Sequence, residues 1–261
     1  MTTTFIDRIA VEFDGDGDAV IALHGLGGTS NTWTPLMGAL TRYRVIRPDL
    51  PGSGRSHRVE GPLSIANLGD AVLKVAARLN VERFHLVGHS MGTIVAMHLA
   101  VREPKRVRSL ALYGPLLTPP DAAKANIRAR GAKARAEGVE GMAAIADAVV
   151  TAGTSSDTRQ HRPLAFAAAR ESLMRQDPDG YARNCDALAD AVPAAVEGLT
   201  IPVLLVTGED DVVAPPQAVG GIADRIAGSR FVLLPRCGHW TPFERPEECA
   251  RELADHLQKV R

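Results

Sequence analysis

Short apolar runs alternate along the chain with stretches whose apolar positions recur at helical spacing. Strands are predicted at Thr4–Asp7, Ile9–Phe13, Ala19–Leu23, Val45–Arg47, Phe84–Val87, Val107–Leu112, Val203–Thr207 and Phe231–Leu234. The intervening helices are predicted at Thr32–Leu40, Ile65–Leu79, Ser90–Glu103, Pro216–Ile226 and Glu247–Val260. Continuous apolar strands that alternate with helices predict an α/β fold, in which helices cover both faces of a mostly parallel sheet.

Residues 114–200 interrupt this alternation. The segment is rich in Ala, Arg and Glu and contains no convincing strand. Apolar side chains recur in it at helical spacing, at Val139, Met142, Ile145 and Val149 and again at Phe166, Ala169 and Leu173. We therefore predict a helical cap, residues 114–200, inserted as a lid between two parts of one core, residues 1–113 and 201–261.

Composition narrows the classes of function. Thirty basic and thirty acidic side chains cancel, so the sequence has no electrostatic footprint for nucleic acid or an anionic membrane surface. No apolar stretch is long enough for a membrane helix, and the first residues do not resemble a signal peptide. The three cysteines, Cys185, Cys237 and Cys249, form no C-x-x-C pair, which argues against disulfides and structural zinc. We expect a cytoplasmic protein with no metal.

The strongest candidate for chemistry is the run Gly88-His89-Ser90-Met91-Gly92, which fits the pattern G-x-S-x-G. It follows a predicted strand and precedes a predicted helix, and the pattern needs this context because a sharp turn lifts the serine hydroxyl above the sheet. Glycines flank the serine because a side chain there would clash within the turn. Ser90 is therefore the candidate nucleophile, and the alternative is a helix start that Ser90 merely caps.

A serine hydroxyl needs a base to take its proton, and the base needs an orienting acceptor. Downstream, one strand ends in Gly208-Glu209-Asp210-Asp211, and the next leads to Cys237-Gly238-His239. Both runs lie just past strand ends, where open α/β sheets place their sites. His239 is the candidate base. The acid is one of three neighbours, Glu209, Asp210 or Asp211.

These motifs make the chain similar to the α/β-hydrolase superfamily along essentially its whole length. The resemblance also includes His24-Gly25-Leu26-Gly27-Gly28, the later Trp33, the run from Asp49 to Ser56, and Gly238-His239 followed by Pro246. In relatives the acid usually stands third after the glycine. The resemblance therefore selects Asp211 here, with Asp210 as the runner-up.

The resemblance further implies an oxyanion hole made by the backbone amides of Leu26 and Met91. Such preorganised donors stabilise a tetrahedral intermediate. The alternative is that the glycine loop is only a flexible turn. Trp33 and Trp240 are candidates to line the substrate pocket. A basic cluster is expected to be a solvated helix face, or else one of its arginines reaches inward to a substrate carboxylate; it comprises Lys124, Arg128, Arg130, Lys133 and Arg135.

Within the superfamily, the chain looks most similar to 3-oxoadipate enol-lactonases and related small carboxylesterases. It departs from that group at Gly92-Thr93, where the group tends to have two glycines, and at His239-Trp240. We expect a serine hydrolase that cleaves a small-molecule ester or lactone through an acyl-enzyme, without a cofactor. The alternatives on the same fold are a cofactor-free lyase, an oxygenase, a serine perhydrolase, and a receptor that has kept the pocket.

Overall fold

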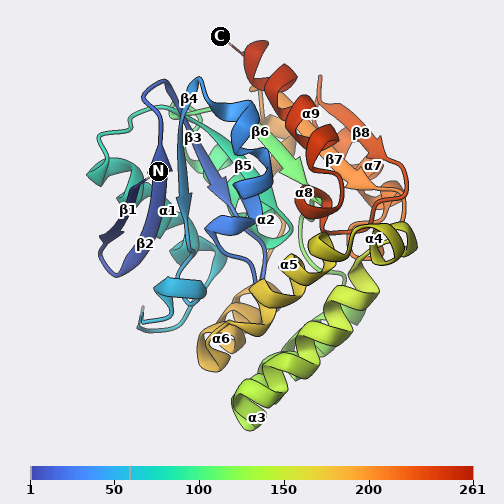
Figure 1. Ribbon diagram of the computed structural model, residues 1–261. Coiled ribbons are helices and arrows are strands. Elements are labelled where there is room, and N and C mark those ends of the chain that lie inside the picture. Colours follow the sequence, from blue (N-terminus) through green and yellow to red (C-terminus); the bar gives the residue numbers. More distant parts are fainter. Residues whose placement is uncertain (1, 59, 261) are drawn as a thin grey trace.

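The computed structural model describes residues 2–58 and 60–260, and it contains the predicted mostly parallel sheet (Figure 1). The spatial order of the strands is β1-β2-β4-β3-β5-β6-β7-β8, with antiparallel pairing at β1–β2 and β2–β4 and parallel pairing from β4 onwards. The strands are β1 (Thr2–Ile6), β2 (Ile9–Asp14), β3 (Asp18–Leu23), β4 (Tyr43–Pro48), β5 (Phe84–His89), β6 (Val107–Tyr113), β7 (Val203–Gly208) and β8 (Arg230–Leu234).

Helices cover both faces of this sheet, because its central strands are apolar on both sides. Along β3, Ile21 and Leu23 join the core beneath α1, α2 and α7, whereas Val20 and Ala22 join the core beneath η1 and α9. The helices of the two faces are α1 (Ile65–Arg78), α2 (Met91–Arg102), α7 (Pro216–Asp224), the 3-10 helix η1 (Ser30–Leu40) and α9 (Pro246–Gln258). The segment predicted as a helix at 32–40 is thus 3-10, with Pro35 inside it.

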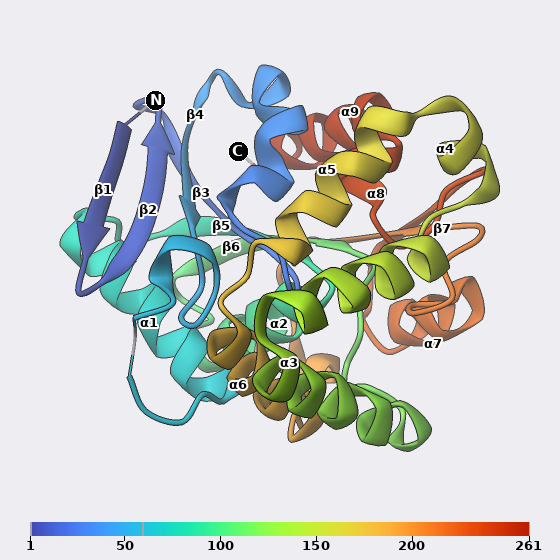
Figure 2. The ribbon, with the colours of Figure 1, turned by 60° about the horizontal axis from the view of Figure 1, so that its bottom comes forward.

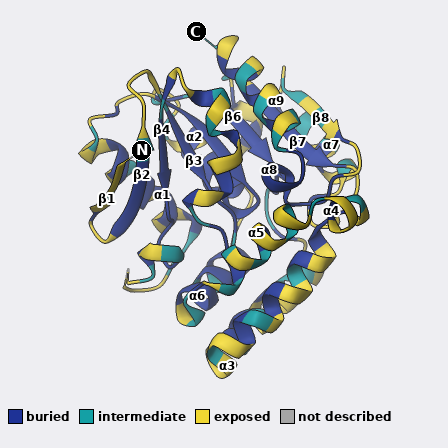
Figure 3. Ribbon diagram, in the orientation of Figure 1, coloured by how far each residue is buried: buried dark blue, intermediate teal, exposed yellow. Residues whose placement is uncertain are grey.

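A helical layer lies between β6 and β7 in the sequence and gathers at one end of the sheet (Figure 2). Its longest member bends at Gly138, whose φ of 60° and ψ of −132° are not helical. Figure 3 shows that one side of this helix is buried and the other exposed. Within the described residues, no helix combines the length and apolar character that crossing a membrane requires. The layer consists of α3 (Asp121–Gly153), α4 (Ser156–His161), α5 (Pro163–Met174) and α6 (Pro178–Ala189).

Buried charges fix the loop that follows β4. Asp49 accepts hydrogen bonds from the Ser30 amide (2.8 Å) and from Arg55, whose Nε lies 2.8 Å from Oδ2. Arg55 also reaches Glu12 on β2 (2.9 Å), and Glu12 in turn pairs with the buried Arg47 (2.8 Å). Burial alone would raise the pKa of Asp49, but these hydrogen bonds outweigh burial and lower it. The run from Asp49 to Ser56 therefore forms a loop that ion pairs anchor to β2.

Two histidines outside this loop, His85 and His256, are buried in the core, and neither forms an ion pair with a carboxylate within the described residues. His85 on β5 lies 2.8 Å from the Ser109 hydroxyl, and His256 lies on the inner face of α9. Burial lowers the pKa of both to about 4, assisted by the positive charges of Arg108 near His85 and Arg230 near His256. Both imidazoles are therefore neutral at pH 7.

These lowered pKa values predict a loss of stability in mild acid. In the unfolded chain the two imidazoles have a pKa of about 6.5, so below that pH they bind protons that they do not bind in the folded chain. The free energy of unfolding therefore falls between pH 6.5 and pH 4. Replacing His256 with Gln should reduce the drop between pH 7 and pH 5 by about 1 to 2 kcal/mol in urea unfolding. The exposed His161 gives the matched control, since His161→Gln should keep the wild-type drop. Equal pH dependence in all three proteins would contradict this account.

Candidate active site

Ser90 stands at a sharp turn between β5 and α2, with φ 51° and ψ −121°. A positive φ is unfavourable for a serine, so the surroundings must hold the turn in place. The Ser90 amide donates to the Tyr113 carbonyl (2.9 Å), and the Thr93 hydroxyl donates to the Ser90 carbonyl (2.6 Å). The Ser90 side chain makes no hydrogen bond to the helix that follows, so it does not act as a helix cap.

The two glycines of the motif allow very close backbone packing. A Cβ on Gly88 would lie 2.7 Å from the carbonyl oxygen of Gly92. A Cβ on Gly92 would lie 2.4 Å from the carbonyl oxygen of Leu23 at the end of β3. Any larger residue would therefore force α2 away from the sheet and move Ser90 with it.

The structure brings Ser90, His239 and Asp211 together in one chain of hydrogen bonds. His239 Nε2 lies 2.9 Å from Ser90 Oγ, and His239 Nδ1 lies 2.9 Å and 3.1 Å from the two carboxylate oxygens of Asp211. All three residues are buried, and Ser90 is the most exposed of them at 9%. They come from the loops after β5, β8 and β7, which end at the same edge of the sheet.

Asp211 is the acidic residue that pairs with His239, and its neighbours Glu209 and Asp210 form no such pair in the described structure. The Val213 and Ala214 amides donate to Asp211 Oδ1 (2.8 and 2.7 Å), and the Thr207 hydroxyl donates to Oδ2 (3.1 Å). Burial alone would raise the pKa of Asp211, but the charge of His239 and these hydrogen bonds lower it. Asp211 is therefore ionised at neutral pH. Glu209 instead accepts from the Arg236 amide.

His89, inside the serine turn, supports His239 rather than replacing it. Its Nε2 lies 2.9 Å from the His239 carbonyl oxygen, to which it donates, and the two rings lie 5.0 Å apart. Burial, together with the nearby His239, lowers the pKa of His89 to about 3. A neutral His89 can donate this bond without placing a second charge beside His239.

The glycine loop passes directly beside Ser90. A Cβ on Gly25 would lie 2.8 Å from the Ser90 Cβ, so only glycine fits there, and Leu26 comes next in the chain. His24 fixes the loop, because its Nδ1 donates to the Gly25 carbonyl (2.8 Å) and its Nε2 accepts from the Leu50 amide (2.9 Å). Met91 is the first residue of α2, where a backbone amide has no acceptor within its own helix.

The cap closes over these residues and leaves a cavity of only about 80 Å³. An ordinary ligand pocket measures roughly 300 Å³ or more, so a whole substrate does not fit inside. Leu173 on α5 packs onto the glycine loop so closely that a Cβ on Gly27 would overlap it, at 1.7 Å. The cavity is lined by Leu26, His89, Ser90, Arg130, Val149, Leu173, Tyr181, Val213, His239 and Trp240.

The two tryptophans predicted to line the pocket have different places. Trp240 lines the cavity, with its ring 5.7 Å from that of His89. Trp33 does not, and the prediction for it needs correction. Trp33 is 1% exposed and packs edge-on against Tyr113 at 5.7 Å, in the core between the sheet and α9. Its side chain points away from Ser90 because η1 runs along the opposite face of the sheet from α2.

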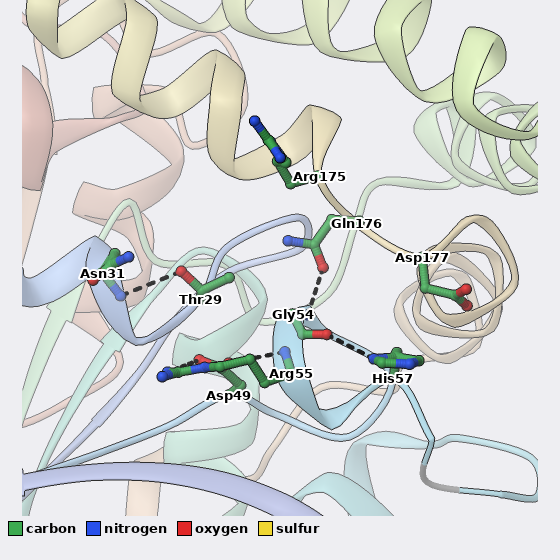
Figure 4. Close-up of a pocket in the computed structure, with 9 residues that line it drawn as sticks. All are labelled: Thr29, Asn31, Asp49, Gly54, Arg55, His57, Arg175, Gln176 and Asp177. Carbon is green, nitrogen blue, oxygen red and sulfur yellow. Dashed lines mark hydrogen bonds and ion pairs between the residues drawn. The ribbon is translucent and has the colours of Figure 1, made fainter. Parts of the chain in front are cut away.

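A larger hollow of about 590 Å³ lies beside the loop after β4, and Figure 4 shows nine of the residues that line it. None of Ser90, His239 and Asp211 is among them. Arg55, one of the cations that line it, is already paired, since it binds Asp49, Glu12 and the Ser30 hydroxyl. Size alone therefore does not identify the reactive cavity. The smaller one contains the hydrogen-bonded serine and histidine.

Glu244, which the sequence analysis did not single out, holds the His239 loop in place. Its carboxylate is fully buried and accepts from the amides on either side of His239, those of Gly238 (3.0 Å) and Trp240 (3.1 Å). It also accepts from the Ser155 amide (2.9 Å) and the Thr158 hydroxyl (2.7 Å) in the cap. One carboxylate thus joins the histidine loop to the cap. The only signal in the sequence is an acidic residue shortly after Gly238-His239.

Comparison with known proteins shows the family of the chain. A model of the alpha/beta hydrolase fold family matches residues 18–246. The 3-oxoadipate enol-lactonase 1 of Acinetobacter baylyi is 30% identical, covering 97% of this chain and 94% of its own. A protein of Variovorax paradoxus assigned as a carbamate hydrolase is also 30% identical, covering 94% and 93%. A malate-bound thermophilic esterase from Thermogutta terrifontis superposes with a TM-score of 0.92 at 26% identity, covering 100% and 99%. The predicted fold and resemblance are thus confirmed.

Glu244→Gln tests whether the buried carboxylate positions the histidine. The side-chain NH₂ group of the glutamine is a donor, and it would face the N–H and O–H donors that now surround the Glu244 carboxylate. The free energy of unfolding should therefore fall by about 1 to 3 kcal/mol. Because the His239 backbone loses its clamp, kcat for short esters should also fall about tenfold or more, with a smaller change in KM. Glu247→Gln, at an exposed carboxylate in the first turn of α9, is the control and should leave both unchanged. Lower stability with unchanged kcat would show that Glu244 only stabilises the fold.

Proposed function

The chain belongs to the alpha/beta hydrolase fold family, and from that premise we propose that it is a serine hydrolase that cleaves a carboxylic ester or lactone through an acyl-enzyme. The observation that carries the proposal is the chain of hydrogen bonds from Ser90 through His239 to Asp211, at a small cavity that Ser90 and His239 line. The expected enol-lactone or ester substrate is also supported by the similarity to an enol-lactonase and an esterase.

In the first step, Ser90 Oγ attacks the carbonyl carbon of the substrate while His239 Nε2 takes its proton. The 2.9 Å separation of these atoms is already that of a hydrogen bond, so little movement is needed. Asp211 holds the Nδ1 proton on the opposite side of the ring and stabilises the imidazolium that forms. The same proton then passes from His239 to the departing alkoxide oxygen, which in a lactone stays attached to the acyl group.

The negative oxygen of the tetrahedral intermediate is proposed to lie between the Leu26 and Met91 amides. Leu26 follows Gly25, which lies against the Ser90 side chain, and Met91 follows Ser90 in the chain. Loss of one such donor typically lowers kcat by about 10² to 10³ fold. Water then attacks the acyl-enzyme with His239 again as the base, and the acid product leaves as Ser90 regains its proton.

Ser90→Ala tests the assignment of the nucleophile. We expect hydrolysis of 4-nitrophenyl acetate and butyrate, and of a simple lactone, to fall by about 10⁴-fold or more, because the substitution removes the proposed nucleophile. The variant should unfold at the same temperature as the wild type. Ser229→Ala is the matched control and should retain wild-type rates, since Ser229 lies beyond the end of α7 and its hydroxyl donates to the Ala223 carbonyl within that helix.

The same variant separates the alternatives on this fold. Turnover by Ser90→Ala near the wild-type rate would contradict the proposal and favour a lyase or oxygenase. A reaction that requires Ser90 but consumes hydrogen peroxide and a carboxylic acid in preference to esters would favour a perhydrolase. If an organophosphonate fails to label Ser90 in the wild type and no ester is cleaved, the receptor alternative holds.

A further inference from the structure

The cavity beside Ser90 has a lining of both polar and apolar residues. Ser90 and His239 are among the polar ones, and Leu26, Val149 and Leu173 are among the apolar ones. The cap supplies the remaining polar groups, Arg130 from α3 and Tyr181 from α6. A ligand that fills so small a cavity must come close to the guanidinium group of Arg130.

Arg130 differs from every other member of the basic cluster on α3. The other four side chains are each paired with a carboxylate. Arg130 is half-buried, and within the described part of the chain it forms no ion pair. The four pairs are Lys124–Asp121 (2.7 Å), Arg128–Asp190 (2.6 Å), Lys133–Glu137 (2.5 Å) and Arg135 with Asp179 and Asp186 (3.3 and 3.1 Å).

The packing of α3 against α6 explains why Arg130 faces inward. A Cβ on the neighbouring Gly131 would lie 3.1 Å from the Cβ of Cys185 and 3.3 Å from the Ala182 backbone, so the two helices lie unusually close at this point. Figure 2 shows α3 and α6 side by side. The contact brings Arg130 near Tyr181 and Cys185, and turns its neighbours on the helix outward to the acidic residues.

Two of the groups near Arg130, Tyr181 and Cys185, are polar and uncharged. The Tyr181 hydroxyl is buried, and the group it meets for hydrogen bonding is the Cys185 thiol, a weak hydrogen-bonding group. Burial raises the pKa of Tyr181 above its usual value, and the positive charge of Arg130 opposes this effect. Burial also raises the pKa of Cys185 to about 11, so neither group supplies Arg130 with a negative charge. A half-buried cation without a counterion is unfavourable, and an anionic ligand would remove that cost.

We propose that Arg130 and Tyr181 bind a carboxylate on the acyl part of the substrate, so that this enzyme prefers esters or lactones of short dicarboxylic acids. The inference rests on the proposed function, because it requires the carbonyl carbon to lie at Ser90. The acyl part is the portion concerned, because a cavity of about 80 Å³ holds a short chain and the leaving group must point outward. A guanidinium group recognises a carboxylate through two parallel hydrogen bonds, and the Tyr181 hydroxyl can donate a third.

The test compares two substrates of equal size that differ only in charge, the mono-4-nitrophenyl ester of glutaric acid and the 4-nitrophenyl ester of glutaramic acid. After subtraction of spontaneous hydrolysis, the wild type should favour the carboxylate over the carboxamide in kcat/KM by about tenfold or more. Arg130→Met should bring this ratio close to one, and Arg130→Lys should restore part of it. Arg128→Met removes a charge from the same helix and should keep the wild-type ratio.

Two further measurements separate recognition from folding. Free glutarate should inhibit the wild type competitively, and about tenfold more weakly in Arg130→Met. The melting temperature of Arg130→Met should equal or exceed that of the wild type, because the substitution removes an unpaired cation. If the wild type cleaves the neutral ester but shows no charge preference, or if the preference survives in Arg130→Met, this inference is wrong and the proposed function stands. If neither ester is cleaved, nor the acetate and butyrate esters, the proposed function itself fails.

Discussion

The strained backbone at Ser90 is the constraint on which the rest of the site depends. A serine at φ 51° lies in a region that L residues avoid, and it stays there because α2 is pressed against β3 at Gly92 and the Ser90 amide is bonded to the end of β6. The turn lifts the hydroxyl above the carboxyl edge of the sheet. The loops after β7 and β8 end at that edge, and they bring Asp211 and His239 to it.

A few buried polar groups then tie separate loops to this one turn. Glu244 joins the His239 loop to the cap, and His24 joins the glycine loop to the segment after β4. Each makes several hydrogen bonds in a buried position, where an unmade bond costs more than it does in water. The cap is therefore bonded to the histidine loop, and a displacement of the cap would also displace His239. Such coupling fits a cavity too small for a whole substrate, since the cap must shift for one to enter.

The sequence was sufficient to predict the sheet, the turn at Ser90 and the position of His239, because local patterns specify them. Apolar runs and glycines at strand ends mark β5, β7 and β8, and the resemblance to known hydrolases, rather than the local pattern, selected Asp211 among its acidic neighbours. The local sequence does not specify the direction of a side chain in the same way. Trp33 follows the glycine loop in sequence, but η1 turns it into the opposite core. Which of the five basic residues on α3 lines the cavity depends on the contact of Gly131 with α6, and this contact joins segments far apart in the sequence. Glu244 was missed because nothing local distinguishes a buried carboxylate from a solvated one.

The central claim is that Ser90 forms a covalent acyl intermediate. The most direct measurement is mass spectrometry of the wild-type enzyme, quenched in acid within milliseconds of mixing with a slowly hydrolysed 4-nitrophenyl ester. The account predicts an increase in mass equal to one acyl group, located on the peptide that contains Ser90, and formed in step with a burst of 4-nitrophenol. Steady turnover of the ester with no acylated Ser90 and no burst would contradict it.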